Sequence, residues 1–407
     1  MKLDLLKRRY SLKKILILSG IFLLILLFGI IYFSNSWDFK TFYDIGMLAR
    51  QKNNIYLASQ TTGLFVFYSP FFSILMMLFT FFPERVSACL FFYLNFILMI
   101  ILFKDLLNDY KEIVDTKRKR MLAIILIYVM VVNFFWLDFH LGQVNFIVCF
   151  LTILGIRLYY EKKYGLSAFC LVLSTFKVVP LIFFFFVLFS KKVKYILFYL
   201  GFLIFFILLP LFHFGIEEGF LLYKNFYTLA ILQKAGINSI GLNQFNNNQS
   251  LWKLFGNLLK ALQISSNEIL IFAIVSLLLI ALFYTFLLTK ELYNKKIEII
   301  YLIGSGFILL MLLFSPDTAS SSHLTNLLLP YSILVFNVLK TKGKTEIALI
   351  SLVLIGNIFA TEEIIGKKID RIFHQNYGFT IIMLMVLFYV FYRLNEIRKT
   401  KLFDVSN

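Results

Sequence analysis

The chain is poor in the residue types that build most soluble catalytic and metal-binding sites. Its 407 residues include three cysteines, four histidines and six prolines, and only 15% of them are charged. Cys89, Cys149 and Cys170 each lie alone inside an apolar run. They predict neither a disulfide framework nor a zinc site, and we expect no bound metal.

The sequence motifs of common soluble enzymes are also missing. The chain has no GxSxG elbow, no P-loop, no HExxH pair and no GxGxxG in a strand context. Soluble-type hydrolase chemistry, nucleotide-driven chemistry and dinucleotide chemistry are therefore not indicated.

Hydrophobic residues dominate instead. They make up 60% of the chain, with 50 phenylalanines and 22 tyrosines, and the mean hydropathy is +0.84. Apolar runs of roughly 14 to 22 residues recur along the whole length, which is close to what a helix needs to cross a bilayer. Because backbone polar groups in lipid must pair within their own segment, such runs are helices. The sequence predicts an all-α polytopic membrane protein with about 10–13 transmembrane or half-spanning helices and short surface helices on the outer face.

The formal net charge of +18 reports membrane topology rather than nucleic-acid binding. Lysine and arginine cluster between the apolar runs, as in "KLDLLKRRYSLKK" at the start and "RLNEIRKTK" near the end. Clusters beside membrane spans mark the cytoplasmic side. We therefore expect a multi-pass protein of the cell (inner) membrane with both termini in the cytoplasm, and no nucleic-acid partner.

Placing the basic clusters inside predicts two segments that do not cross the membrane as single helices. Residues 69–83, "SPFFSILMMLFTFFP", are too short to span. Residues 166–189 have basic clusters on both sides, so we expect two half-helices that meet at Lys177 and Pro180. Full spans are expected at 15–33, 86–103, 121–137, 143–159, 195–211, 268–289, 297–314, 324–339, 346–360 and 379–394.

This topology gathers polar segments on the outer face. They are "WDFKTFYDIG", "WLDFHLGQVN", "STFKVVP", the loop 212–267 with "NNNQSLW", and "SPDTASSSHL", and all four histidines fall there too. No linker or internal repeat divides residues 1–407, which we expect to form one membrane domain. This asymmetry predicts that the functional site lies at the outer leaflet of the membrane.

Two charged residues in these segments need a physical explanation. Asp38 begins an amphipathic segment suited to a helix on the membrane surface, where it is either a helix N-cap or a general base whose pKa burial raises. Asp44 falls on another face of that helix and is interpreted as a solvated charge. Lys177 interrupts an apolar run, so it either snorkels to the interface or binds an anion such as phosphate.

The segment "DFHLGQVN" supplies polar groups at a tight helix–helix apex. Asp138 is interpreted as a cap in a polar turn, and Asp138 with His140 does not define a metal site. Gln143 and Asn145 open the next span and are expected to hydrogen-bond a polar ligand.

Two later segments carry further candidates. Asn248 and Gln249 precede an amphipathic stretch, "LWKLFGNLLKALQ", that predicts a second surface helix. His323 ends a run of small residues and opens a span, a position more typical of a structural interface residue.

In order and spacing these segments resemble glycosyltransferase family 87, the polyprenyl-phosphate-mannose-dependent α-mannosyltransferases of the GT-C superfamily. The resemblance covers roughly residues 36–330 and rests on "WDFKTFYDIG", "NNIY", "YSP", "LGQVN", "STFKVVP", "NNQSL" and "FSP…H". The wording "SPDTASSSH" before His323 and the second position of "KVVP" depart from the family pattern.

The resemblance implies a GT-C fold and inverting transfer of a hexose, with mannose the expected sugar. The donor is a polyprenyl-phosphate sugar, the acceptor an envelope glycan or glycolipid, and the site faces the non-cytoplasmic side, in contact with membrane lipid. The lipid-linked sugar is itself the donor substrate, so no cofactor is expected. Asp38 matches the general base. Lys177 matches the lysine of the family's Lys-x-x-Pro motif and His323 its histidine after the "SP" turn, and we expect both to bind the donor phosphate.

Sugar or acceptor contacts are expected from Tyr43, Tyr68, His140, Gln143, Asn145, Asn248 and Gln249.

Two other classes of protein stay open. One is an envelope oligosaccharide polymerase or ligase that uses lipid-diphosphate-linked substrates. The other is a transporter, whose polar residues would be spread through the depth of the bilayer.

Overall fold

The computed structural model describes residues 37–57, 68–228, 249–263, 267–315, 321–360 and 362–404, and their regular structure is helical throughout. The expected first span, 15–33, lies outside these residues. In chain order the helices are α2 (Trp37–Arg50), α4 (Pro70–Met77), η1 (Leu78–Phe81), α5 (Glu84–Asp109), α6 (Lys117–Leu141), α7 (Asn145–Tyr160), α8 (Tyr164–Leu173), η2 (Ser174–Lys177), η3 (Val179–Ile182), α9 (Phe183–Phe189), α10 (Val193–Phe214), α11 (Ile216–Asn225), α12 (Leu251–Ala261), α13 (Asn267–Thr289), α14 (Ile297–Phe314), η5 (Ser321–Leu327), α15 (Leu328–Thr341), α16 (Lys344–Phe359), α17 (Glu362–Ile365), α18 (Lys367–Gln375) and α19 (Gly378–Asp404).

Seven helices in the described part of the chain are long and apolar enough to cross a membrane. They are Glu84–Asp109, Lys117–Leu141, Val193–Phe214, Glu268–Thr289, Ile297–Phe314, His323–Thr341 and Gly378–Thr400. Shorter apolar helices accompany them at Pro70–Phe81, Asn145–Tyr160, Tyr164–Lys177 and Val179–Phe189. The chain is an all-α, multi-pass membrane protein, as the sequence predicts.

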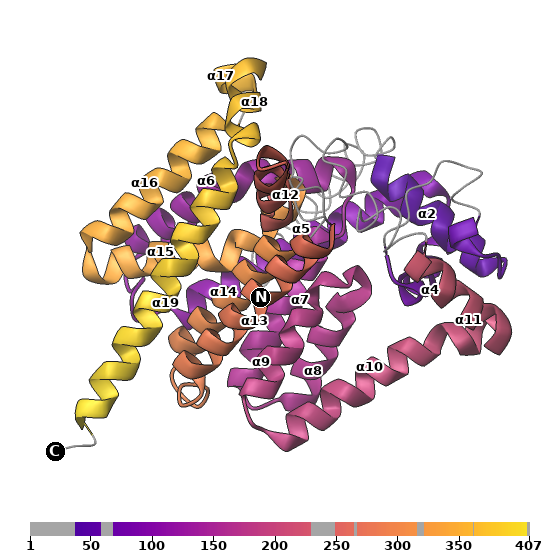
Figure 1. Ribbon diagram of the computed structural model, residues 1–407, viewed down its shortest axis with the longest axis horizontal. Helices are drawn as coiled ribbons and strands as arrows, with labels where there is room; N and C mark the ends of the chain where they lie inside the picture. Colours follow the sequence, from indigo (N-terminus) through magenta and orange to yellow (C-terminus); the bar gives the residue numbers. More distant parts are fainter. Residues whose placement is uncertain are drawn as a thin grey trace, which may run out of the picture.

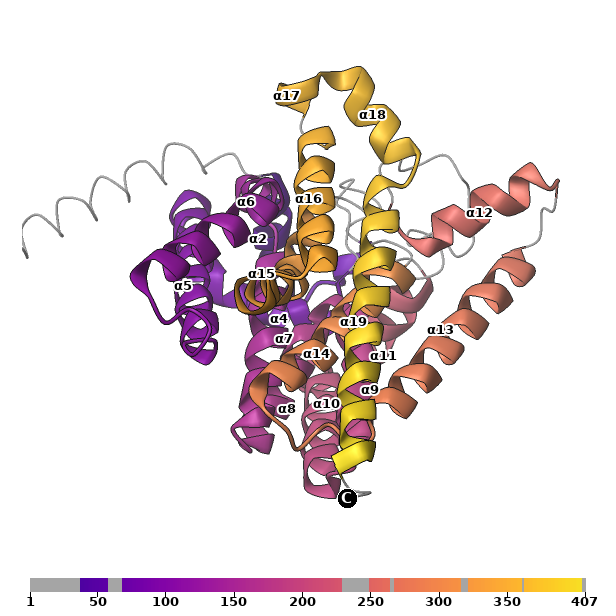
Figure 2. The same ribbon diagram turned by 90° about the vertical axis from the view of Figure 1, so that its left-hand side faces the viewer.

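Helix α14 forms the centre of the bundle. Its residues from Ile300 to Leu313 are buried without interruption, and Figure 2 shows it between α7 and α19. A Cβ atom at Gly304 would lie 2.4 Å from Cδ1 of Ile156 in α7, so the absence of a side chain there permits close helix packing. Helices α10 and α13 instead expose large side chains such as Phe212 and Phe272, as expected of helices that face lipid.

The two edges of the bundle carry different elements. Figure 1 shows the turn from α9 to α10 and the C-terminal end of α19 toward one edge, and α17 and α18 toward the opposite edge. Basic residues flank the first edge, with Lys191, Lys192 and Lys194 at the α9–α10 turn. The positive-inside rule assigns such a cluster to the cytoplasmic side.

The apolar run 166–189 is broken at its middle. Helix η2 ends at Lys177 and η3 begins at Val179, with Pro180 in its first turn. Val178, between them, has φ 9° and ψ −41°, outside the helical region. Proline lacks the N–H that would continue the helix, so the break falls where the sequence predicts it.

The ends of the two half-helices that lie away from Lys177 come together in one place. The ring centroid of Tyr159 lies 5.6 Å from that of Tyr164, which begins α8, and 5.5 Å from that of Phe186, near the end of α9. Ser167 in α8 also hydrogen-bonds the hydroxyl of Tyr195 in α10, at 2.7 Å. The segment is therefore a hairpin with Lys177 at its tip, which confirms the prediction.

The segment after the first predicted span forms a helix, but its apolar face is covered by protein. Phe39 and Phe42 in α2 are buried, and their rings lie 5.1 Å from Phe91 in α5 and 5.3 Å from Phe72 in α4. The expectation that this face lies on the membrane surface is therefore wrong. Periodicity shows that a helix has an apolar face, not what covers it.

Helices α2 and α4 approach closely at Gly46. A Cβ atom there would lie 2.6 Å from the backbone oxygen of Met76. A Gly46→Leu substitution should therefore separate α2 from α4, and overpacking of this kind costs about 1–3 kcal/mol. We expect a lower melting temperature for the purified, detergent-solubilised protein.

The matched control is Gly201→Leu, because a Cβ atom at Gly201 in α10 would meet nothing within 4 Å. It should melt as the wild type does. Equal melting temperatures for the two variants would show that α2 and α4 do not pack as described.

Candidate active site

Polar side chains from well-separated parts of the chain form one connected cluster, which we call the polar cluster. Its members are Asp38 in α2, Tyr68 before α4, Asp138 in α6, Gln143 in the α6–α7 turn, Asn145 in α7, Lys177 in η2 and His323 in η5. Six of the seven are residues that the sequence singles out as base, phosphate-binding or sugar-binding candidates.

Gln143 connects the aspartate end of the cluster. Its Nε2 donates to Oδ2 of Asp38 at 2.5 Å, and its Oε1 accepts from the hydroxyl of Tyr68 at 3.2 Å. The turn that presents it depends on Gly142, whose φ of 68° lies in the left-handed region that glycine adopts at little cost. The local sequence "LGQVN" thus ends α6 and presents Gln143 toward α2.

Lys177 forms the cationic end of the cluster. Its Nζ donates to Oδ1 of Asn145 and lies 2.6 Å from Nε2 of His323 and 5.7 Å from the centroid of the Tyr68 ring. An ammonium group has no acceptor, so Nε2 of His323 accepts and that imidazole is neutral in this arrangement. An ammonium over an aromatic face is further stabilised by the ring quadrupole.

Backbone contacts fix Tyr68 and His323 beside the hairpin tip. The backbone N–H of Ser69 donates to the carbonyl of Phe176 at 2.9 Å, which places Tyr68 next to Lys177. The thiol of Cys149 in α7 donates to the carbonyl of Thr325 at 3.5 Å and so joins η5, which carries His323, to α7. Sequence spacing could not identify either of these two hydrogen bonds.

Asp138 is fully buried at the end of α6. Its Oδ2 accepts from the backbone N–H of Phe146 at 2.9 Å, so it caps the first turn of α7, as the sequence predicts. Its Oδ1 accepts from Nδ2 of Asn145 at 2.8 Å. This second contact links Asp138 to Lys177 through Asn145, and sequence reasoning missed it.

Opposing effects act on the pKa of the Asp38 carboxyl group, and the pKa is raised overall. Partial burial raises its pKa above the ordinary value of 3.8, while the hydrogen bond from Gln143 and the positive charge of Lys177 oppose the rise. Asp44 belongs to a different environment, since the charges that act on it are those of Glu84 and Lys40. Of the two aspartates in α2, only Asp38 joins the polar cluster.

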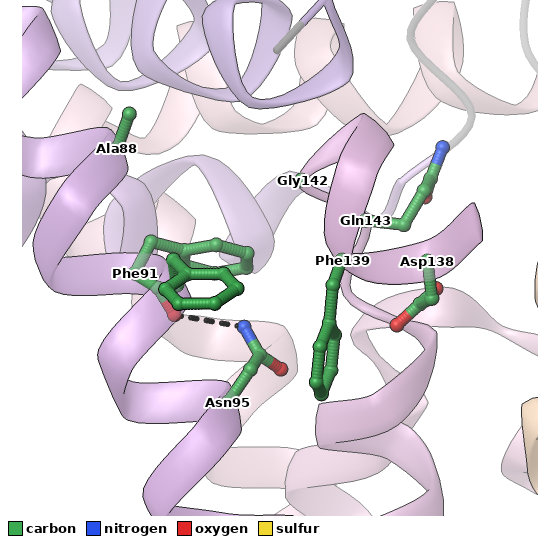
Figure 3. Close-up of a pocket in the computed structure, with 8 residues that line it drawn as sticks. Ala88, Phe91, Asn95, Asp138, Phe139, Gly142 and Gln143 are labelled. Atoms are coloured by element: carbon green, nitrogen blue, oxygen red, sulfur yellow. Dashed lines mark hydrogen bonds between the residues drawn. The ribbon is translucent and has the colours of Figure 1, made fainter. Parts of the chain in front are cut away.

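A narrow pocket lies beside the cluster, between α5 and the end of α6. It is lined by Ala88, Phe91, Phe92, Asn95, Asp138, Phe139, Gly142 and Gln143. Figure 3 shows Phe91 and Asn95 on one wall and Phe139 on the other, with the side-chain amide of Asn95 donating to the carbonyl of Phe91 at 2.9 Å. The pocket thus joins aromatic surface to two members of the polar cluster.

Other predicted ligand-binding residues have contacts elsewhere. The hydroxyl of Tyr43 donates to the carbonyl of Phe82 at 3.0 Å, and the ring of His140 stacks on Trp136 at 5.9 Å between centroids. Asn248 lies outside the described residues. Within the described ranges no group of three or more histidine, cysteine, aspartate or glutamate side chains is arranged to hold a metal ion.

Gln249 is used by the fold. It is buried, its Nε2 donates to the carbonyl of His374 at 2.8 Å, and its Oε1 accepts from the backbone N–H of Phe379 at 3.1 Å. Both ends of the amide are therefore occupied by the α18–α19 connection. The expectation that Gln249 contacts sugar is corrected to a role in holding this connection.

The arrangement combines a half-buried carboxylate with an ammonium in one hydrogen-bonded unit of a membrane bundle. Such a unit can accept a proton at one end and stabilise negative charge at the other. The fold and the cluster thus define a multi-pass membrane protein in which a carboxylate and an ammonium group are held together.

Comparison with protein families adds the particular class. The family model of glycosyltransferase family 87 matches residues 65–316, more than half of the chain. The chain belongs to this family and is a membrane glycosyltransferase, which sets the transporter alternative aside. The match includes Tyr68, Asp138, Gln143, Asn145 and Lys177, whereas Asp38 and His323 lie outside it. A comparison with curated proteins found no match.

Gln249→Leu tests the structural role of that residue. The change leaves the carbonyl of His374 and the N–H of Phe379 without their partner, and an unsatisfied buried group costs about 1–3 kcal/mol. We expect a clearly lower melting temperature in detergent. Gln375→Leu, at an exposed position in α18, should leave it unchanged; equal melting of both variants would contradict the role given to Gln249.

Proposed function

We propose that this glycosyltransferase moves a hexose, with mannose the expected sugar, from a polyprenyl-phosphate donor to a glycan or glycolipid acceptor, with inversion at the anomeric carbon. The observation that carries the proposal is the connection of the Asp38 carboxylate to the Lys177 ammonium through shared partners in one polar cluster. Displacement of a phosphate by a hydroxyl is assisted by a base that takes the hydroxyl proton and by a cation that stabilises the leaving phosphate.

Asp38 is proposed as the general base. The acceptor hydroxyl loses its proton to the carboxylate as its oxygen forms a bond to the anomeric carbon. A carboxylate whose pKa is raised by burial is a better proton acceptor than a fully solvated one. The bond from the anomeric carbon to the phosphate oxygen breaks in the same step, and the polyprenyl phosphate carries the electron pair away.

Lys177 is proposed to stabilise the departing phosphate. Negative charge grows on the phosphate as the bond breaks, and a positioned ammonium stabilises that charge more in the transition state than in the ground state. His323 supports it by accepting from Nζ of Lys177. Tyr68 and Gln143 are proposed to contact the sugar or phosphate from the same cluster. Asn145 is buried and its amide is used by Asp138 and Lys177, so its proposed role is to hold the ammonium group rather than to contact the ligand.

The proposed site faces the non-cytoplasmic side of the cell membrane in a GT-C type bundle. The basic α9–α10 turn and the C-terminal end of α19 lie toward one edge (Figure 1), and the positive-inside rule makes that edge cytoplasmic. A donor with a long lipid chain can reach such a site from within the bilayer. Tyr43, His140 and Asn248 stay expected contacts of the sugar or the acceptor.

The test uses purified protein with a panel of polyprenyl-phosphate hexoses and an extract of envelope acceptors. Release of polyprenyl phosphate is measured. Consumption of lipid-diphosphate oligosaccharides instead of monophosphate sugars would overturn the proposal in favour of a polymerase or ligase.

Asp38→Asn should abolish transfer without unfolding the protein. General-base catalysis contributes about 10²–10⁴-fold, so a loss of this size in kcat is expected, with donor affinity little changed. Asp44→Asn is the matched control in the same helix and should retain activity. An Asp38→Asn variant as active as the control would exclude Asp38 as the base.

The pH dependence of transfer should report the ionisation of Asp38. Because its pKa is raised above 3.8, kcat/KM should fall as the pH drops through that raised value. The hydrogen bond from Gln143 lowers this pKa, so Gln143→Leu should move the acid limb to higher pH. Gln51→Leu, at an exposed site after α2, is the control; an acid limb unchanged in Gln143→Leu would contradict the coupling.

A further inference from the structure

Asp138 does more than cap a helix. Accepting from the backbone N–H of Phe146 requires one oxygen, which a serine, threonine or asparagine side chain also offers. Asp138 is instead a fully buried carboxylate, and burying such a charge is costly unless its oxygens are paired. Its second oxygen is paired with Nδ2 of Asn145.

This second contact determines which way the amide of Asn145 points. An amide has a donor end and an acceptor end, and an isolated asparagine can present either one. Oδ1 of Asp138 accepts in this contact, so Asn145 turns Nδ2 toward Asp138. Its Oδ1 is then directed at Nζ of Lys177, which only donates.

The result is a chain of alternating polarity from Asp138 through Asn145 to Lys177. The amide of Asn145 has one orientation that satisfies both of its neighbours, Asp138 and Lys177. Asn145 is fully buried, so water cannot substitute for a lost partner. The direction of the ammonium at the hairpin tip therefore depends on a carboxylate that it reaches through one amide.

We infer that Asp138 is a positioning residue for the phosphate of the lipid-linked donor, acting by fixing the Asn145 amide so that its oxygen holds the Lys177 ammonium. The inference rests on the proposed function of Lys177. Asp138 itself has both oxygens occupied, and its role is to orient rather than to contact the donor.

The primary test measures the binding of short-chain polyprenyl phosphate to the full-length protein in detergent. Asp138→Asn replaces the carboxylate oxygen that faces Asn145 by an NH₂ group. Nδ2 of Asn145 then has no acceptor there, and the Asn145 amide turns so that its NH₂ group faces the Lys177 ammonium. We expect the dissociation constant to rise about tenfold or more, which is about 1.4 kcal/mol or more, because the Lys177 ammonium loses the hydrogen bond that holds it.

A double substitution provides the rescue. In Asp138→Asn/Asn145→Asp the new amide at position 138 can accept from the N–H of Phe146 and donate to the new carboxylate at position 145. The second oxygen of that carboxylate can then accept from Lys177. Because the alternating pattern is restored, affinity should return to within about threefold of the wild type, about 0.7 kcal/mol. Asn145→Asp alone places two carboxylates together and should bind weakly.

Melting temperature and a remote control separate positioning from general destabilisation. Asp109→Asn removes a carboxylate at the far end of α5, where it accepts from the hydroxyl of Tyr301 at 2.5 Å. It should lower stability and leave affinity for polyprenyl phosphate unchanged. Unchanged affinity in Asp138→Asn, or no rescue in the double variant, would overturn the inference.

Lys177→Ala is measured in the same assay to keep the two hypotheses distinct. Weak binding by Lys177→Ala with normal binding by Asp138→Asn rejects the positioning role alone. Normal binding by Lys177→Ala rejects the proposed role of the lysine, and with it the inference. Weak binding by both, with rescue in the double variant, supports both.

Discussion

The Lys177 ammonium is the group around which the polar part of this structure is organised. A cation among apolar helices is expensive to desolvate unless partners compensate it. Here the compensation comes from α7, η5 and the segment before α4, through Asn145, His323 and the ring of Tyr68. The helix that carries Lys177 is broken directly after it, so the lysine stands at the tip of a hairpin.

The hairpin explains why the neighbouring helices are short. Helices α8 and α9 are each too short to cross the bilayer, and their ends away from Lys177 meet at an aromatic group around Tyr159 and Tyr195. Helix α7 packs beside them and against the buried α14, where Gly304 permits close approach. The buried core thus holds the base of the hairpin, and the tip carries Lys177.

The sequence predicts the helical class, the hairpin and most of the polar cluster, for physical reasons that are local. The length of the apolar runs indicates membrane helices, and the free-energy cost of placing a lysine within the membrane singles out Lys177 as a functional candidate. It does not predict the partners of polar groups in loops. Gln249 looks like a ligand-binding residue because an amide in a polar loop carries no mark of its partner, and its partners lie more than a hundred residues away. The link from Asp138 to Lys177 is hidden for the same reason.

Tyr68 belongs to both ends of the proposed catalytic unit. Its hydroxyl donates to Gln143, which in turn donates to Asp38, while its ring faces Lys177. A shift of this one side chain would therefore change the hydrogen bonding of the base and the environment of the cation together. Because the charge of Lys177 also lowers the pKa of Asp38, the two ends are coupled electrostatically as well. An anionic phosphate beside Lys177 would weaken that influence and raise the proton affinity of Asp38, so donor binding itself would prepare the base.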